Sequence, residues 1–180
     1  MTSSRTMAGL LFAGAIILAS PLRAQTLCDP TETSAFSCAL KTSGKIVSLC
    51  ASADLGKTTG YLQYRFGTPG KVELAVPGER TGTPGLALTR SADAHATYDD
   101  LTFSRGPYVY EITSFRQLTP KNGDGFPTPP SSDTLGVRDD RRSMKQGDWV
   151  FNDECASLGA PLDVIAIANK IGAEVARGGF

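Results

Sequence analysis

The chain has 180 residues, and 18 lysines and arginines balance 18 aspartates and glutamates, so its formal net charge is zero. This balance excludes the broad basic surface that non-specific nucleic-acid binding needs. A hydrophobic fraction of 41% with a charged fraction of 20% excludes an intrinsically disordered chain. A single histidine, His95, excludes a metal site made of several histidines. We therefore expect a folded protein with no nucleic-acid partner and no metal.

The N-terminal segment predicts export from the cytoplasm. Arg5 precedes an apolar run from Ala8 to Ala19, and Pro21 follows that run. The run is shorter than the roughly 20 apolar residues that a membrane-spanning helix needs. A short apolar run that follows a positive residue and ends in small residues is typical of a secretory signal peptide. We expect cleavage after Ala24.

Cleavage there makes residues 1–24 the signal peptide and residues 25–180 a single β-rich secreted domain of ordinary length. It removes Arg5 and Arg23 and no acid, which leaves a formal charge of −2. No later segment is long and apolar enough to span a membrane. The sequence therefore predicts a periplasmic or secreted protein with no stable membrane insertion after cleavage.

The cysteines fit that compartment, because an even number of cysteines in an exported chain predicts disulfides. They are Cys28, Cys38, Cys50 and Cys155. Their spacing includes no C-x-x-C pair of the kind found in zinc sites. We expect two disulfides and no free thiol, and four cysteines allow three pairings.

The pairing is left open by two opposing arguments. A short hairpin connection favours Cys38–Cys50, and Cys28–Cys155 would then tie the N-terminal segment to the C-terminal region. Strand alternation argues against this, because Cys38 shares its strand face with Phe36, whereas Cys50 lies opposite the apolar face of the next strand. The sequence places Cys38–Cys50 slightly ahead without deciding between the pairings.

Seven short strands separated by Gly and Pro turns are predicted in the first two thirds of the chain. They are Ala35–Leu40, Lys45–Ala51, Tyr61–Phe66, Val72–Val76, Leu86–Arg90, Tyr98–Ser104 and Tyr108–Phe115. This spacing is typical of an antiparallel sandwich or barrel. In the third strand Gln63 and Arg65 alternate with Tyr64 and Phe66, which predicts one face in water and one face in the core.

The C-terminal third changes character. Residues 119–136 hold four prolines and three glycines, which predicts a long surface loop. Trp149–Phe151 follows as a short apolar strand. We expect a helix over residues 161–177, because Pro161 suits a first helical turn and Gly178 suits a stop. The predicted fold is therefore mainly β, an antiparallel sandwich or barrel with one C-terminal helix.

No catalytic motif is present in the sequence. It has no Gly-rich nucleotide loop and no G-x-S-x-G elbow, and its one imidazole, His95, lies in a segment without an apolar pocket. No cofactor is therefore predicted. A glycosidase needs only two carboxylates at a suitable separation, so a carboxylate-based carbohydrate enzyme stays open as an alternative. Its candidates are the acids on or beside strands, Glu73, Asp99, Asp100 and Glu111.

Two basic turns beside aromatic residues are the candidate binding sites. Ser104, Arg105 and Tyr108 belong to a tight hairpin turn, and Lys145 begins a second turn that leads to Trp149. Arginine and tyrosine on rigid hairpin tips make good binding anchors. The alternative is that Tyr108 and Trp149 belong to the core and that the basic residues only solvate the turns.

Residues 28–77 resemble a group of small uncharacterised secreted proteobacterial proteins. The segments that carry the resemblance are Phe36–Cys38, Gly44–Ala51, Tyr61–Gly67 and Val72–Leu74. It implies an exported location and a β-rich fold.

The sequence also resembles the periplasmic inhibitors of c-type lysozyme, which are small disulfide-bonded β-barrels. Phe36–Cys38 is similar to their aromatic-x-Cys opening strand. Ser104–Tyr108 is similar to their Ser-Gly-x-x-Tyr turn with an added Arg, and Lys145–Gly147 to their Lys-Gly turn with an added Gln. The resemblance implies that Ser104 and Lys145 enter a lysozyme cleft and engage its catalytic acids.

These observations favour a non-enzymatic binding protein with a protein partner in the cell envelope. Its most concrete form is an inhibitor of a cell-wall enzyme such as lysozyme. The alternatives are the carboxylate-based enzyme and a structural component of the envelope.

Overall fold

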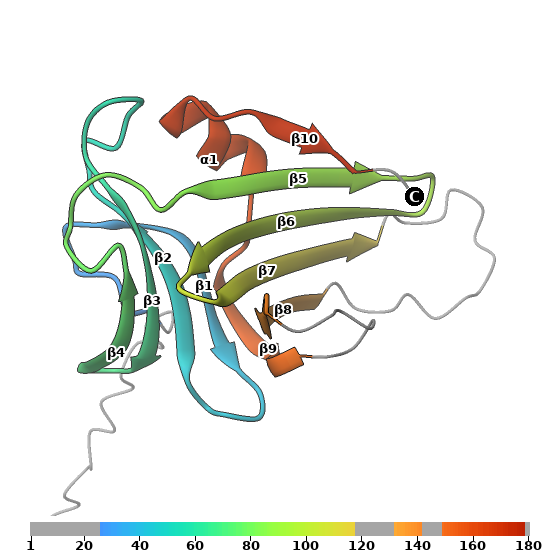
Figure 1. The fold of residues 1–180 in the computed structure, drawn as a ribbon, viewed down its shortest axis with the longest axis horizontal. Coiled ribbons are helices and arrows are strands. Elements are labelled where there is room, and N and C mark those ends of the chain that lie inside the picture. Colours follow the sequence, from blue (N-terminus) through green and yellow to red (C-terminus); the bar gives the residue numbers. More distant parts are fainter. Residues whose placement is uncertain (1–25, 118–131, 142–148, 179–180) are drawn as a thin grey trace, which may run out of the picture.

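Strands that are neighbours along the chain mostly pair with one another, because short turns connect them. The computed structural model describes residues 26–117, 132–141 and 149–178 (Figure 1). Its elements are β1 (Thr33–Leu40), β2 (Ile46–Ala51), β3 (Leu62–Thr68), β4 (Lys71–Val76), β5 (Leu86–Ala92), β6 (Ala96–Arg105), β7 (Tyr108–Gln117), β8 (Ser132–Asp139), β9 (Trp149–Ala160), α1 (Val164–Ile171) and β10 (Val175–Arg177). The signal peptide predicted over residues 1–24 lies outside the described residues.

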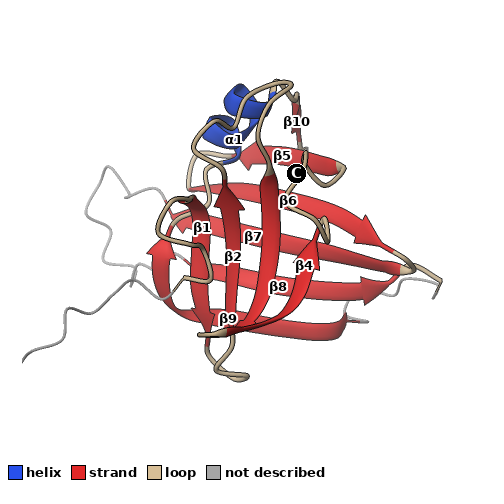
Figure 2. Cartoon of the chain, turned by 90° about the vertical axis from the view of Figure 1, so that its left-hand side faces the viewer, coloured by secondary structure: helices blue, strands red, loops and turns tan. Residues whose placement is uncertain are grey.

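Strand β9 joins two halves of one sheet, whose order is β10-β5-β6-β7-β8-β9-β1-β2-β3-β4. Its residues Trp149–Glu154 pair with β8, and Cys155–Ala160 pair with β1. The strands β1–β4 lie across β5–β8, so the two halves face each other with their strands crossing (Figure 2). Strands β4 and β10 are the two edges. The mainly β, sandwich-like prediction is confirmed. The sheet does not close into a barrel within the described residues, and β10 pairs with β5 in parallel.

The faces that the two halves turn toward each other form the core. Phe36, Leu49 and Tyr64 of the first half belong to the same buried cluster as Leu101 and Ile112 of the second, and none of them is more than 1% exposed. The helix α1 closes one end of this core with its buried apolar side (Figure 1). Burying each of these large side chains contributes about 1.5–3 kcal/mol, so the core holds the halves together.

The disulfides are Cys28–Cys50 and Cys38–Cys155, so the pairing that the sequence placed slightly ahead is wrong. Val47 lies directly opposite Cys38 in the β1–β2 ladder, and Cys50 lies on the other face of the sheet. The alternation of side chains along the two strands had already argued against a Cys38–Cys50 bond. All four cysteines are bonded, as predicted. Two disulfides indicate an oxidising compartment outside the cytoplasm.

The C-terminal helix is shorter than the predicted range of residues 161–177. It ends at Gly172, whose left-handed φ of 69° suits glycine and whose N–H bonds to the Ala168 carbonyl. The helix begins after Asp163, whose side chain accepts hydrogen bonds from two backbone N–H groups of the first turn. The remaining residues Val175–Arg177 form β10 instead. No helix among the described residues has the length and hydropathy of a membrane span.

The predicted loop over residues 119–136 is also too long at its C-terminal end. Ser132–Gly136 belongs to β8, which pairs with β7 along its whole length. Leu135 explains the difference, because this side chain enters the core and is 1% exposed. Residues 118–131, which include the rest of the predicted loop, lie outside the described part of the chain.

Candidate functional site

An apolar cleft lies between the two halves of the sheet. Its cavity volume is about 260 Å³, and its walls come from strands of both halves. The lining residues are Tyr64, Phe66, Leu74, Tyr108, Tyr110, Leu135, Val137, Val150 and Phe151. Clefts with apolar and aromatic walls are the usual form of small-molecule sites, although this one is slightly smaller than the usual range of about 300–1,000 Å³.

Aromatic rings set the shape of the cleft. Tyr64 packs against Phe103 and Tyr110 with ring centroids 4.9 and 5.7 Å apart, and this contact spans the two halves. Phe66 and Phe151 make an edge-on contact at 5.9 Å, again between the halves. Such pairs contribute about 0.5–1.5 kcal/mol beyond their buried area. The walls are therefore fixed by packing before any ligand enters.

A β-bulge places Val150 in the lining. In the β8–β9 ladder Val137 pairs with Phe151 and Arg138 pairs with Trp149, so Val150 has no partner of its own. An extra residue of this kind bends its strand and re-aims side chains. Val150 is 55% exposed, which makes it the most accessible large hydrophobic side chain among the described residues.

The predicted hairpin forms part of the rim of the cleft. Arg105 and Tyr108 lie directly opposite each other, and Gly106 takes the left-handed φ of 57° that the tight turn requires. Ser104 and Arg105 are exposed, as a binding tip requires, and Tyr108 is half-buried against the cleft. The fourth predicted binding residue, Lys145, lies outside the described residues.

Trp149 is neither a core residue nor part of the cleft. It is 37% exposed, and its ring lies over the backbone of Gly136. A Cβ at position 136 would come within 2.4 Å of that ring, so only glycine leaves room for it there.

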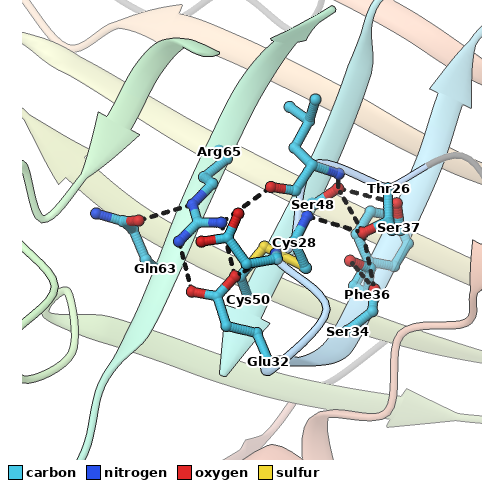
Figure 3. Close-up of a disulfide and its surroundings, with 12 residues drawn as sticks. Thr26, Cys28, Glu32, Ser34, Phe36, Ser37, Ser48, Cys50, Gln63 and Arg65 are labelled. Carbon is cyan, nitrogen blue, oxygen red and sulfur yellow. Dashed lines mark hydrogen bonds and ion pairs between the residues drawn. A yellow bond between two sulfur atoms is a disulfide. The ribbon is translucent and has the colours of Figure 1, made fainter. Parts of the chain in front are cut away.

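The predicted wet face of β3 is buried instead. Gln63 and Arg65 are each 3% exposed, because residues 26–32, which we term the strap, cross the outer face of β1–β3 (Figure 3). Arg65 donates hydrogen bonds of 2.7 and 2.6 Å to the two carboxylate oxygens of Glu32, and another to the Leu27 carbonyl. The side chains of this ion pair are 3% and 2% exposed. A charge buried so deeply must be paired.

Further contacts fasten the strap. The Leu27 N–H donates to the Ser48 hydroxyl, and Cys28 is bonded to Cys50 (Figure 3). Cys28, Glu32 and Cys50 lie within metal-ligand distance of one another. Their two sulfurs are bonded together, however, and a thiolate is the form that binds metal. The cluster is therefore a structural anchor.

Electrostatics in the strap favour the charged form of Glu32. Burial raises the pKa of its carboxyl, but hydrogen bonds from Arg65, Tyr61 and the Asp29 N–H outweigh burial, so the pKa lies below its ordinary value. The same carboxylate raises the pKa of Tyr61 by accepting its hydrogen bond. In the cleft, burial raises the pKa of Tyr64, so its ring stays a neutral phenol.

The four carboxylates proposed for a glycosidase lie in three separate places. Asp99 is held on the inner face by two hydrogen bonds of 2.5 Å from Arg90. Asp100 and Glu111 come together on the outer face, where the Thr113 hydroxyl lies 2.7 Å from an Asp100 oxygen and 3.4 Å from a Glu111 oxygen. The remaining candidate, Glu73, is paired with Lys45 in the other half of the sheet. None of these four acids lines the apolar cleft.

Comparisons with models of known protein families, with curated proteins and with solved structures found no match.

Sequence reasoning missed both the cleft and the strap. The cleft has no local signal, because its walls come from five strands that meet only when the halves cross. The strap had one: Glu32 lies shortly after Cys28, and Arg65 interrupts an otherwise apolar and neutral strand. An acid and a base of that kind suggest a pair, but not which residues cover it.

Replacing Glu32 with Gln tests the buried ion pair. It leaves the Arg65 charge buried without a carboxylate, so we expect the free energy of unfolding at pH 7 to fall by about 3 kcal/mol. The pKa of Glu32 is lowered in the folded state, so its contribution is complete above the unfolded pKa and disappears as the pH falls through the folded pKa. The difference between variant and wild type should therefore shrink in acid.

The matched control is Glu73→Gln, because the Lys45–Glu73 pair has side chains 32% and 31% exposed. Its expected cost is much smaller than that of Glu32→Gln, because water and salt screen an exposed ion pair. Urea unfolding from pH 3 to pH 7 measures both variants. Equal small losses for the two would contradict a buried, stabilising Glu32–Arg65 pair.

Proposed function

We propose that this chain is an exported binding protein that holds the apolar part of a ligand in the cleft between its two half-sheets. The observation that carries the proposal is a cavity whose lining is almost entirely aliphatic and aromatic and whose mouth is open. Two disulfides support a location in the periplasm or outside the cell.

The cleft suits binding better than structural filling. The lining atoms lack packing partners on the open side of the cleft, and a bound ligand would supply those contacts. Val150 lines this cleft and is 55% exposed, although burial of a valine is favourable. Exposed apolar surface of this kind marks interaction sites. An apolar ligand in the cleft would remove this exposed apolar surface from water, and that removal would drive binding.

The neutral dye N-phenyl-1-naphthylamine tests this proposal, because its fluorescence rises when it leaves water. We expect saturable binding of one dye molecule to the wild-type protein. Val150→Glu places a carboxylate in the apolar cleft, so we expect it to weaken binding by about tenfold or more. Since Val150 is largely exposed, the fold should tolerate the change.

Val72→Glu is the matched control, because Val72 is 47% exposed on β4 and does not line the cleft. It should leave dye binding unchanged. Absence of saturable binding to the wild type, or equal weakening in both variants, would overturn the proposal.

Inhibition of a c-type lysozyme is the second candidate function. The observation in its favour is the tight hairpin whose exposed Ser104 and Arg105 project at the rim of the cleft. A rigid exposed turn suits insertion into an enzyme cleft, because little conformational entropy is lost on binding.

Titration of lysozyme activity with the purified mature protein tests the second candidate. Inhibition at micromolar excess, weakened by Arg105→Ala at the hairpin tip, is the expected result. Full lysozyme activity at that excess would end the inhibitor hypothesis, whatever the outcome of the dye experiment.

A further inference from the structure

The inner face of the second half-sheet changes from apolar to charged along its strands. Residues directly opposite each other in a ladder point to the same face, so the register defines rows across β6, β7 and β8. From the core to the rim, the rows are Leu101, Ile112 and Leu135, then Phe103, Tyr110 and Val137, then Arg105, Tyr108 and Asp139.

The middle and last rows meet at the cleft. Tyr110 and Val137 line it from the middle row, and Tyr108 lines it from the last row. Because Arg105 lies opposite Tyr108, its side chain starts from the cleft side of the hairpin rather than from the outer side. A cation therefore stands where the apolar wall ends.

The charges in the last row are not equivalent. Asp139 is bound by Arg141, which donates hydrogen bonds of 2.9 and 2.7 Å to its two carboxylate oxygens. Arg105 is exposed and forms no ion pair with any residue in the described part of the chain. Arginine keeps its charge at every physiological pH and offers a planar fork that fits a carboxylate.

We propose that the ligand is a single-chain anionic amphiphile, whose tail enters the apolar cleft and whose carboxylate meets Arg105 at the rim. This inference rests on the proposed function and adds the chemical class of the ligand. The tail supplies most of the affinity, because it is the part removed from water. Arg105 supplies the preference for a negative head group. It adds little to the affinity, because a salt bridge at an exposed rim is modest in strength.

Calorimetric titration with three probes of equal chain length tests the assignment: dodecanoate, dodecanol and dodecyltrimethylammonium. The two ionic probes are kept below their critical micelle concentrations and dodecanol below its solubility limit. We expect dodecanoate to bind most tightly and the cationic probe least tightly. Arg105→Gln should weaken dodecanoate by about three- to fivefold and leave dodecanol unchanged. The preference for dodecanoate should fall as salt is added, because exposed charges are screened.

Arg177→Gln is the matched control, because it removes the same charge from an exposed position on the edge strand β10. It should leave all three affinities unchanged. Dodecanol binding as tightly as dodecanoate, or equal effects of the two arginine variants, would overturn the anionic head group and leave the apolar cleft intact as a site. Failure of all three probes to bind would overturn the proposed function as well.

Discussion

The cleft depends on the double pairing of strand β9. One end of β9 bonds to β8 and the other to β1, so a single strand turns two half-sheets into one sheet that folds over itself. Cys38–Cys155 cross-links that junction and closes a sequence separation of 117 residues. In the chain-entropy model such a bridge contributes about 5 kcal/mol. Asp153 of β9 adds a further tie, because its carboxylate accepts from the N–H groups of Thr42 and Ser43 in the turn after β1.

The strap covers and fastens the outer face of the first half-sheet. Without it, Gln63 and Arg65 would face water, and the outer face of β3 would be the ordinary solvated side of an antiparallel sheet. With it, the strands β1–β3 are covered on both sides, by the strap outside and by the second half inside. A half-sheet held in this way offers a rigid wall, and rigid walls let a binding site form before its ligand arrives.

Local patterns predicted the strands, the hairpin at Arg105 and the faces of β1 and β2, because these depend on alternation and on turn residues. They could not predict what covers a face, so Arg65 was expected in water. Local patterns also misplaced the ends of elements. The helix was predicted to continue past Gly172, and the start of β8 was assigned to a loop. The cleft could not be predicted, because Val150 and Leu74 are brought to one cavity only by the crossing of the half-sheets and the bulge in β9.

The central claim is that an apolar ligand occupies the cleft between the half-sheets. Methyl-resolved NMR of the leucine and valine side chains during titration with dodecanol tests it most directly, since each methyl group reports its own position. The account predicts shifts at Leu74, Val137 and Val150, with Val72 and the buried helix residue Val164 unaffected. Shifts confined to Val72 or Val164, or no shifts at a saturating concentration, would contradict it.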